Sequence, residues 1–185
     1  MRVALFGGSF NPPHVGHEMA ALYVLETASV DELWFVPCFK HAFEKALEPF
    51  EDRLRMCALA AGALGPRARV SDIEGALGGE SRTLRTVGAF EARHPEHQFA
   101  LVIGADLIAE TNTWYGADEL RRRVPFIVVG RAGVGGPRQP VEIPAVSSTE
   151  IRRALGEGKP VRGLVSRTIL DYIYARGLFG AREPA

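Results

Sequence analysis

Residues 7–17 read GGSFNPPHVGH, and this stretch is the most informative part of the sequence. It follows an apolar run over 3–6, which is typical of a strand buried on both faces of a parallel sheet. A helical pattern begins at its end, so the glycines lie at a strand-to-helix turn. Such a turn directs backbone N–H groups and the positive end of the helix dipole outward, and glycine lets a phosphate approach closely. The stretch therefore predicts an anion site, although it matches neither GxxxxGK[ST] nor GxGxxG.

Two histidines, His14 and His17, stand three residues apart at the start of this helix and should share one face of its first turn. Imidazoles beside a phosphate cradle donate hydrogen bonds and stabilise the charge of a phosphoryl group in transfer. Structural capping and a zinc pair are the alternatives. HxxH alone is weak evidence for zinc, because no nearby Cys, Asp or third His completes a ligand set. We favour phosphate chemistry and predict no protein-held metal here.

The rest of the chain alternates apolar runs with helical patterns, which predicts βαβ units. The expected fold is a doubly wound, Rossmann-like parallel sheet with helices on both faces and a short C-terminal helical extension. We treat 1–185 as one domain, with 147–180 as its helical part. The expected strands are 2–6, 33–36, 69–73, 99–103, 126–129 and 141–146; the expected helices are 15–28, 49–64, 83–93, 147–155 and 166–175, with short helices within 106–123 and a loop over 130–140.

The composition and charge of the chain argue against several classes of protein. The chain has 185 residues, of which 46% are hydrophobic and 24% charged, and 22 basic residues balance 22 acidic ones. Zero net charge argues against binding to duplex nucleic acid by bulk electrostatics. No apolar run reaches membrane-spanning length. The two cysteines lack CxxC spacing, which suits a reducing cytosol and predicts a cytoplasmic protein. A homo-oligomer is compatible with the sequence.

A second signal lies at 146–152, which reads VSSTEIR. Ser and Thr are good N-caps and leave the first-turn amides available to an anion. Arg152 follows Thr149 by three residues, so both could reach the same phosphate. Taken alone, an ordinary capped helix with a solvated arginine explains the segment. Together with the first stretch, a phosphate site is the better interpretation.

These motifs resemble those of a known superfamily. The first is similar to the (T/S)-F-(D/N)-P-x-H-x-G-H signature of the nucleotidylyltransferases, and the second to their I-S-(S/A)-T-x-I-R motif. Three further segments, SRTLRT at 81–86, IGAD at 103–106 and TWY at 113–115, resemble in order and spacing those of nicotinate mononucleotide adenylyltransferases. The resemblance runs from Arg2 to about Leu178. It implies adenylyl transfer from ATP to nicotinate mononucleotide in NAD biosynthesis, releasing pyrophosphate without a covalent enzyme intermediate.

The resemblance also implies roles for individual residues. Catalytic roles fall to His14, His17, Arg152 and a lysine, either Lys40 or Lys45. ATP binding falls to Gly7, Gly8, Ser9, Phe10, Gly16, Val146, Ser147, Ser148 and Thr149. Mononucleotide binding falls to Thr83, Gly104, Asp106, Trp114, Tyr115 and Arg131. Mg²⁺ would accompany ATP, held mostly by phosphates and water because no carboxylate cluster marks a metal cage.

The residue types at the acceptor side fit this interpretation. The Trp114 indole can stack on a pyridine ring, and Asp106 can accept hydrogen bonds from ribose hydroxyls. Core packing of Trp114 and helix capping by Asp106 are the structural alternatives.

The chain departs from the family pattern at two places. Residues 36–45 read VPCFKHAFEK where many members carry a P-P-H-K-like segment, and Arg82 stands where an aromatic residue is common. Nicotinamide mononucleotide therefore remains an alternative acceptor. Pantetheine-phosphate adenylyltransferase is a close alternative, but Trp114 and the 81–86 segment speak against it. A cytidylyltransferase and a nucleotide-binding sensor without turnover are the other candidates.

Overall fold

The computed structural model describes residues 1–40, 46–133 and 140–182. Its centre is a six-stranded sheet in the order β3-β2-β1-β4-β5-β6, with every neighbouring pair parallel. From β1 at the centre, the chain continues through β2 to β3 at one edge of the sheet. It then crosses back, and β4, β5 and β6 follow in order on the other side of β1. The strands are β1 (Arg2–Gly8), β2 (Glu32–Pro37), β3 (Ala68–Val70), β4 (Gln98–Gly104), β5 (Phe126–Arg131) and β6 (Glu142–Ile143).

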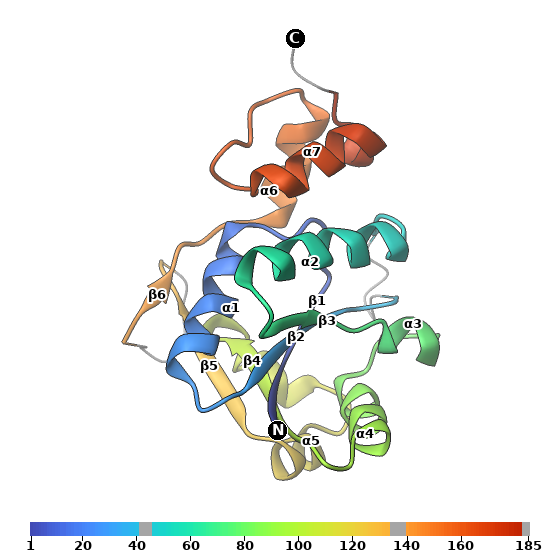
Figure 1. The fold of residues 1–185 in the computed structure, drawn as a ribbon, viewed down its shortest axis with the longest axis vertical. Helices are drawn as coiled ribbons and strands as arrows, with labels where there is room; N and C mark the ends of the chain where they lie inside the picture. The colour runs from blue at the N-terminus through green and yellow to red at the C-terminus, as the bar shows by residue number, and fades with distance from the viewer. Residues whose placement is uncertain (41–45, 134–139, 183–185) are drawn as a thin grey trace.

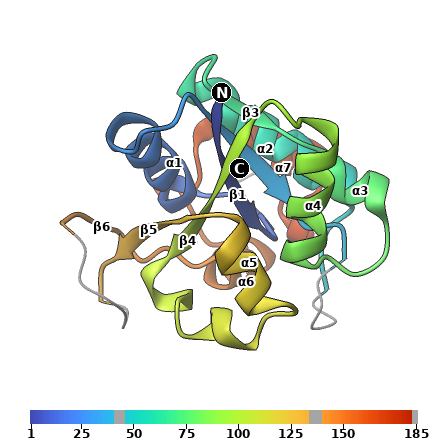
Figure 2. The same cartoon turned by 90° about the horizontal axis from the view of Figure 1, so that it is seen from below.

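Helices cover both faces of this sheet, and Figure 2 shows α1 and α4 on opposite sides of β1 and β4. Within 1–40, 46–133 and 140–182, no helix combines the length and the apolar character that a membrane span needs. The α-helices are α1 (Val15–Thr27), α2 (Phe50–Leu64), α3 (Ile73–Leu77), α4 (Thr83–Arg93), α5 (Ala117–Arg123), α6 (Ser148–Gly156) and α7 (Arg167–Arg176); the 3₁₀ turns are η1 (Ala105–Leu107), η2 (Glu110–Thr113) and η3 (Leu178–Gly180).

The sheet separates two hydrophobic cores because side chains alternate along each strand. In β1, Ala4 faces the core shared with α1, α2, α6 and α7, whereas Val3 and Leu5 face the core shared with α3, α4 and α5. In β2, Phe35 and Trp34 divide in the same way. Burial on both faces explains why these strands read as unbroken apolar runs.

Of the C-terminal helices, which lie above the sheet in Figure 1, α7 packs on α2. Ile151 and Ile169 belong to the same core as α1 and α2. The buried Asp52 carboxylate of α2 accepts hydrogen bonds from the Tyr172 hydroxyl at 2.7 Å and from Arg176 Nε at 3.1 Å. Apolar burial and the polar contacts of Asp52 therefore help to hold this segment against α2.

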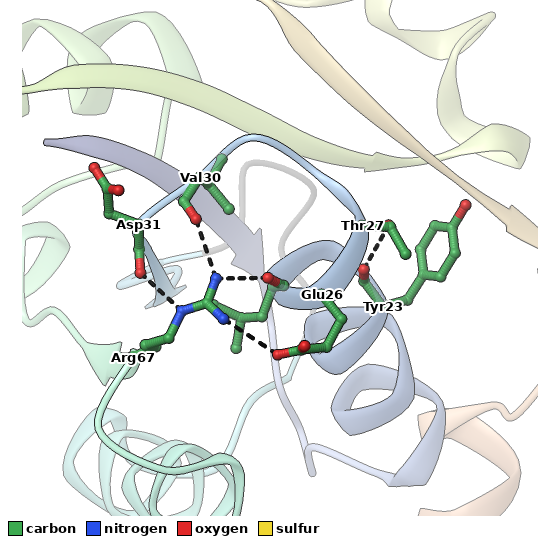
Figure 3. Close-up of polar contacts among 7 residues, drawn as sticks. Tyr23, Glu26, Thr27, Val30, Asp31 and Arg67 are labelled. Carbon is green, nitrogen blue, oxygen red and sulfur yellow. Dashed lines mark hydrogen bonds and ion pairs between the residues drawn. The ribbon is translucent and has the colours of Figure 1, made fainter.

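One arginine fixes the connection between α1 and β2. The Arg67 guanidinium donates to the carbonyls of Val30 and Asp31, each at 3.1 Å, and pairs with the Glu26 carboxylate at 3.2 Å (Figure 3). The Arg67 carbonyl in turn accepts from the N–H of Leu33 at 2.9 Å, inside β2. Arg67, in the connection between α2 and β3, thus holds the turn that precedes β2.

The predicted fold class is confirmed, and two expected strands need correction. The strand expected over 69–73 ends at Val70, because Asp72 precedes a short helix that begins at Ile73. The strand expected over 141–146 shrinks to Glu142–Ile143, since the next residue is a proline with no N–H for the ladder. The first two residues of the loop expected over 130–140 belong to β5. Residues 134–139 of that loop lie outside the described residues.

Candidate active site

A cavity of about 660 Å³ lies where β1, β2, β4 and β5 end. Its lining includes Gly7 and Gly8 of β1, Gly104 of β4 and Arg131 of β5. The chain reverses its direction across the sheet between β1 and β4, and in open α/β sheets ligands bind at the carboxyl ends beside such a reversal. The position of the cavity thus follows from the topology.

The two histidines form a stacked pair at the N-terminus of α1. His14 is the N-cap and His17 the third residue of the helix; their ring centroids are 3.7 Å apart with 25° between the planes. The backbone N–H of His14 donates to His17 Nδ1 at 3.2 Å. Because that nitrogen accepts, a neutral His17 carries its proton on Nε2. Both side chains line the cavity.

Both histidines are neutral at physiological pH. Burial, followed by the positive charge of Arg131, lowers the pKa of His14 from 6.5 to about 4. Burial also places the pKa of His17 well below its usual value, with smaller contributions from His14 and Arg131. A neutral imidazole offers one N–H donor and one acceptor nitrogen. The pair can therefore donate to an anion without carrying a buried charge beforehand.

Aromatic packing holds the histidine pair in place. The Phe10 side chain lies in the core with 1% of its surface exposed, and its ring centroid is 5.0 Å from that of His17; the expected contact of Phe10 with ATP stays a prediction. A Cβ on Gly8 would lie 3.1 Å from the Phe10 ring, and one on Gly16 would lie 3.2 Å from the His14 ring. The two glycines thus make room for the rings that position the pair.

Arg131 links η1 to the second motif. Its guanidinium pairs with the Asp106 carboxylate at 3.1 Å and donates to the Val146 carbonyl at 2.7 Å. Our sequence interpretation placed Arg131 near the charged groups of the acceptor and Asp106 at a ribose. Both line the cavity, and each is the other's ion-pair partner. Arg131 also lies close enough to lower the pKa of both histidines.

The second motif lies directly against the first. Ser147 caps α6 by accepting from the Glu150 N–H at 3.4 Å, and the Ser148 hydroxyl donates to the Pro12 carbonyl at 3.0 Å. Arg152 donates to the Asn11 carbonyl at 2.8 Å and to the Thr149 hydroxyl at 3.2 Å. Of this motif, Val146 lines the cavity itself, and the N-terminus of α6 lies beside the turn before α1.

The residues expected at the mononucleotide line the other part of the cavity. Thr83 begins α4 and Gly104 ends β4, while Trp114 is half-buried against the core beneath α4 and α5. Tyr115 is 65% exposed, and the Arg82 guanidinium lies 5.8 Å from the centre of its ring. Trp114 therefore packs against the core and also lines the cavity.

The structure describes only one of the two candidate lysines, Lys40. Lys40 is exposed, its backbone bridges to Glu80, and its side chain is not among those that line the cavity. Lys45 lies outside the described residues. The requirement for a lysine from this loop stays a prediction.

Arg53, which the sequence motifs do not include, organises the loops beside the cavity. Its side chain is 1% exposed, and burial lowers its pKa. It donates to four carbonyls, those of Ser9 at 3.0 Å, Cys38 at 2.7 Å, Phe39 at 3.2 Å and Glu48 at 3.0 Å. Its spacing from Met56, Cys57 and Ala60 on the buried face of α2 was the available signal.

Glu74, which the sequence motifs do not include either, is a buried carboxylate that lines the cavity. It accepts hydrogen bonds from the hydroxyls of Ser81 and Thr86, and Ser81 Oγ accepts from the Phe39 N–H at 2.9 Å. The hydroxyls of the SRTLRT segment thus join α3, the start of α4 and the loop after β2.

Comparison with known proteins agrees with this architecture. The cytidylyltransferase-like family model matches residues 5–154. A probable nicotinate-nucleotide adenylyltransferase of Anaeromyxobacter sp. (strain K) is 48% identical over 96% of each chain, and one of Myxococcus xanthus (strain DK1622) is 38% identical over 99% of this chain and 97% of its own.

A solved structure supports the fold. Nicotinic acid mononucleotide adenylyltransferase of Plasmodium falciparum, complexed with NaAD, superposes with a TM-score of 0.81 at 21% identity over 98% of each chain. The chain therefore belongs to the cytidylyltransferase-like family and, within it, to the nicotinate-nucleotide adenylyltransferases, a group of nucleotidyltransferases.

Proposed function

We propose that this chain transfers the adenylyl group of ATP to nicotinate mononucleotide, giving nicotinate adenine dinucleotide and pyrophosphate. The observation that carries the proposal is the stacked, neutral pair His14–His17 at the N-terminus of α1, facing the cavity at the sheet reversal. The curated names of the full-length relatives support the choice of substrates.

The chemistry is an in-line substitution at phosphorus. An oxygen of the acceptor's 5′-phosphate forms a bond to the α-phosphorus of ATP, and the bond from that phosphorus to the bridging oxygen breaks. The electron pair leaves with pyrophosphate. No enzyme nucleophile takes part, so catalysis consists of positioning and charge stabilisation. The Nε2–H of His17 supplies a donor, the N-terminus of α1 contributes the positive end of its dipole, and Arg131 supplies positive charge beside them.

ATP lies, in this proposal, between the two motifs. Gly7, Gly8 and Gly16 allow the triphosphate to approach the backbone, while the hydroxyl of Thr149 and the guanidinium of Arg152 contact it from α6. Arg152 stabilises the leaving pyrophosphate. Among the described residues, no carboxylate that lines the cavity belongs to a cluster of three metal-ligating side chains. Mg²⁺ therefore enters as part of the MgATP substrate, with phosphates and water as its main ligands.

The acceptor lies against α4, η1 and η2. Trp114 provides a face for the pyridine ring, and main-chain N–H groups near Thr83 and Tyr115 receive the ring carboxylate at helix starts, where negative charge is favoured. Arg82, held over Tyr115, adds positive charge at the same wall of the cavity.

A substrate panel tests the proposal. Purified protein is given MgATP or MgCTP with nicotinate mononucleotide, nicotinamide mononucleotide or phosphopantetheine, and pyrophosphate release is measured. We expect the highest kcat/KM for MgATP with nicotinate mononucleotide. Preference for phosphopantetheine or CTP would replace the proposed substrates, and binding of ATP without turnover of any acceptor would identify a sensor instead.

A further inference from the structure

We propose that His94, Glu96 and His97 bind a divalent transition-metal ion of the zinc class, at the end of the sheet opposite the nucleotide cavity. Among the described residues, this is the cluster of three His, Cys, Asp or Glu side chains whose ligand atoms all lie within 4.8 Å of one another. None of the three lines the cavity, and the adenylyl-transfer proposal does not use them.

The backbone brings the three side chains together in one turn. His94 terminates α4, where its N–H donates to the Phe90 carbonyl at 2.8 Å. The His94 carbonyl then accepts from the N–H of His97 at 3.0 Å, and β4 begins at the next residue. Secondary structure on both sides therefore fixes the turn, so the metal would meet a preformed site.

The distances suit one small ion. Glu96 Oε1 lies 3.1 Å from Nδ1 of His97 and 3.8 Å from Nδ1 of His94. Two ligands about 2.0–2.1 Å from a tetrahedral zinc ion are themselves about 3.4 Å apart. The observed separations lie on either side of that value, so small side-chain rotations would complete the geometry.

The buried member of the cluster lacks a hydrogen bond. His97 is only 11% exposed, and its Nδ1 is a buried atom without a hydrogen-bond partner among the described residues. The rings of His94 and His97 stack with centroids 5.3 Å apart, and the edge of Trp34 packs against both. Packing accounts for the ring positions, and Glu96 Oε1 lies 3.1 Å from that nitrogen without forming a hydrogen bond; a metal ion bound to both atoms would satisfy them.

The donor set selects the kind of metal. Two imidazoles and one carboxylate suit Zn²⁺, Cu²⁺ or Ni²⁺ rather than Mg²⁺ or Ca²⁺, which prefer oxygen ligands. His94 and Glu96 are 37% and 61% exposed, so water can take the remaining coordination position. The length of β4 places the site about 20 Å from Gly104, at the end of the strand where the proposed chemistry takes place.

Zinc titration of protein made without a polyhistidine tag tests the site. Isothermal titration calorimetry with ZnCl₂ should show one site per chain. Glu96→Gln and His97→Gln should each weaken it by at least about tenfold, a loss that even an outer-shell change can cause. Glu142→Gln, an exposed glutamate elsewhere, and His14→Gln, in the cavity, should leave zinc affinity unchanged.

A second readout locates the ion. The chain has two tryptophans, so a Trp114→Phe background leaves Trp34 as the reporter. Cu²⁺ should quench its fluorescence, and Glu96→Gln should abolish the quenching at the same metal concentration. Glu96 is exposed, so this variant keeps the fold even if His97→Gln does not. Unchanged zinc binding in Glu96→Gln, or loss of it in His14→Gln, would overturn the proposal.

Discussion

The guanidinium of Arg152 donates a 2.8 Å hydrogen bond to the main-chain carbonyl of Asn11, across 141 positions of sequence. Asn11 itself is buried, and its side-chain oxygen accepts from the N–H of Glu48 at 3.0 Å. The turn before α1 is therefore held from two sides, by α6 and by the segment before α2. A residue expected to bind phosphate also shapes the cradle for it.

Replacing His17 should remove most turnover. His17→Ala takes away a preorganised donor at the N-terminus of α1, and loss of one such donor typically lowers kcat by about 10²- to 10³-fold. Steady-state pyrophosphate release measures the effect, with circular dichroism to verify the fold. Met19→Ala, an exposed residue of the same helix, serves as the matched control and should retain activity. A folded His17→Ala enzyme with normal kcat would refute the catalytic role.

Arg152→Ala should impair the use of ATP more than the use of the mononucleotide. A charge-assisted hydrogen bond contributes about 1.5–3 kcal/mol, which corresponds to about tenfold or more in kcat/KM for ATP. Arg153→Ala changes the exposed neighbour on α6 and should have little effect. If Arg152→Ala instead raised only the KM for the mononucleotide, the two substrates would have to exchange places in the cavity.

The enzyme should prefer nicotinate mononucleotide to the nicotinamide form by about tenfold or more. Where the wall of the cavity offers donors only, the amide NH₂ would be left unpaired at a cost of about 1–3 kcal/mol, and 1.36 kcal/mol is tenfold in rate. The comparison is kcat/KM for both acceptors at the same MgATP concentration. Arg82→Gln should narrow the preference, whereas Arg85→Gln, which lies outside the cavity lining, should not. Equal values for the two acceptors in the unmodified enzyme would contradict this account of the pocket.

His14 should make stability depend on pH between 6.5 and about 4. Above pH 6.5 its side chain is neutral in both the folded and the unfolded chain, so it contributes no pH dependence. As the pH falls towards 4, the unfolded chain binds a proton that the folded chain excludes, and the free energy of unfolding decreases. The full difference is about 3 kcal/mol.

Urea unfolding of the unmodified protein and of His14→Asn, at pH 7.5, 5.5 and 4.5, measures this contribution. Most carboxylate titrations are common to both proteins and cancel in the difference. The variant should lose less stability on acidification. Parallel curves for the two proteins would mean that His14 titrates normally in the folded chain.

Arg53→Met should destabilise the fold by about 3 kcal/mol or more. The substitution leaves several buried carbonyls without a donor, and each unsatisfied group costs about 1–3 kcal/mol. The midpoint of urea unfolding reports the loss. Arg55→Met, on the exposed face of the same helix, is the control and should change stability little. Equal effects of the two substitutions would show that the carbonyl network contributes no stability.

Local sequence patterns predicted much of the fold. The strand, turn and helix around residues 7–17 follow from an apolar run, glycines and a helical pattern, all within one stretch of chain. The five-residue helix α3 was missed because a single turn shows no periodicity. The motif places Phe10 beside the nucleotide but does not indicate that its ring packs in the core between Phe6, His17 and Phe35.

The partners of charged residues could not be predicted in the same way. Arg131 and Asp106 are 25 positions apart, and their ion pair exists only because β4 and β5 are neighbours. Arg53 was overlooked because an arginine in a helix is usually solvated, and its buried position depends on four carbonyls from other segments. The spacing along α2 places Arg53 on the buried face of the helix, but the partners of these charged groups are set by tertiary structure.

The contact between the start of α1 and the last part of the chain has a consequence for biosynthesis. The N–H of Val15, in the first turn of α1, donates to the carbonyl of Leu164 at 3.0 Å, and Arg152 completes the turn just before it. Translation proceeds from the N-terminus, so the histidines leave the ribosome long before these supports do. A nascent chain can form β1 and α1 early, but it acquires its finished phosphate cradle only after residue 164 has emerged.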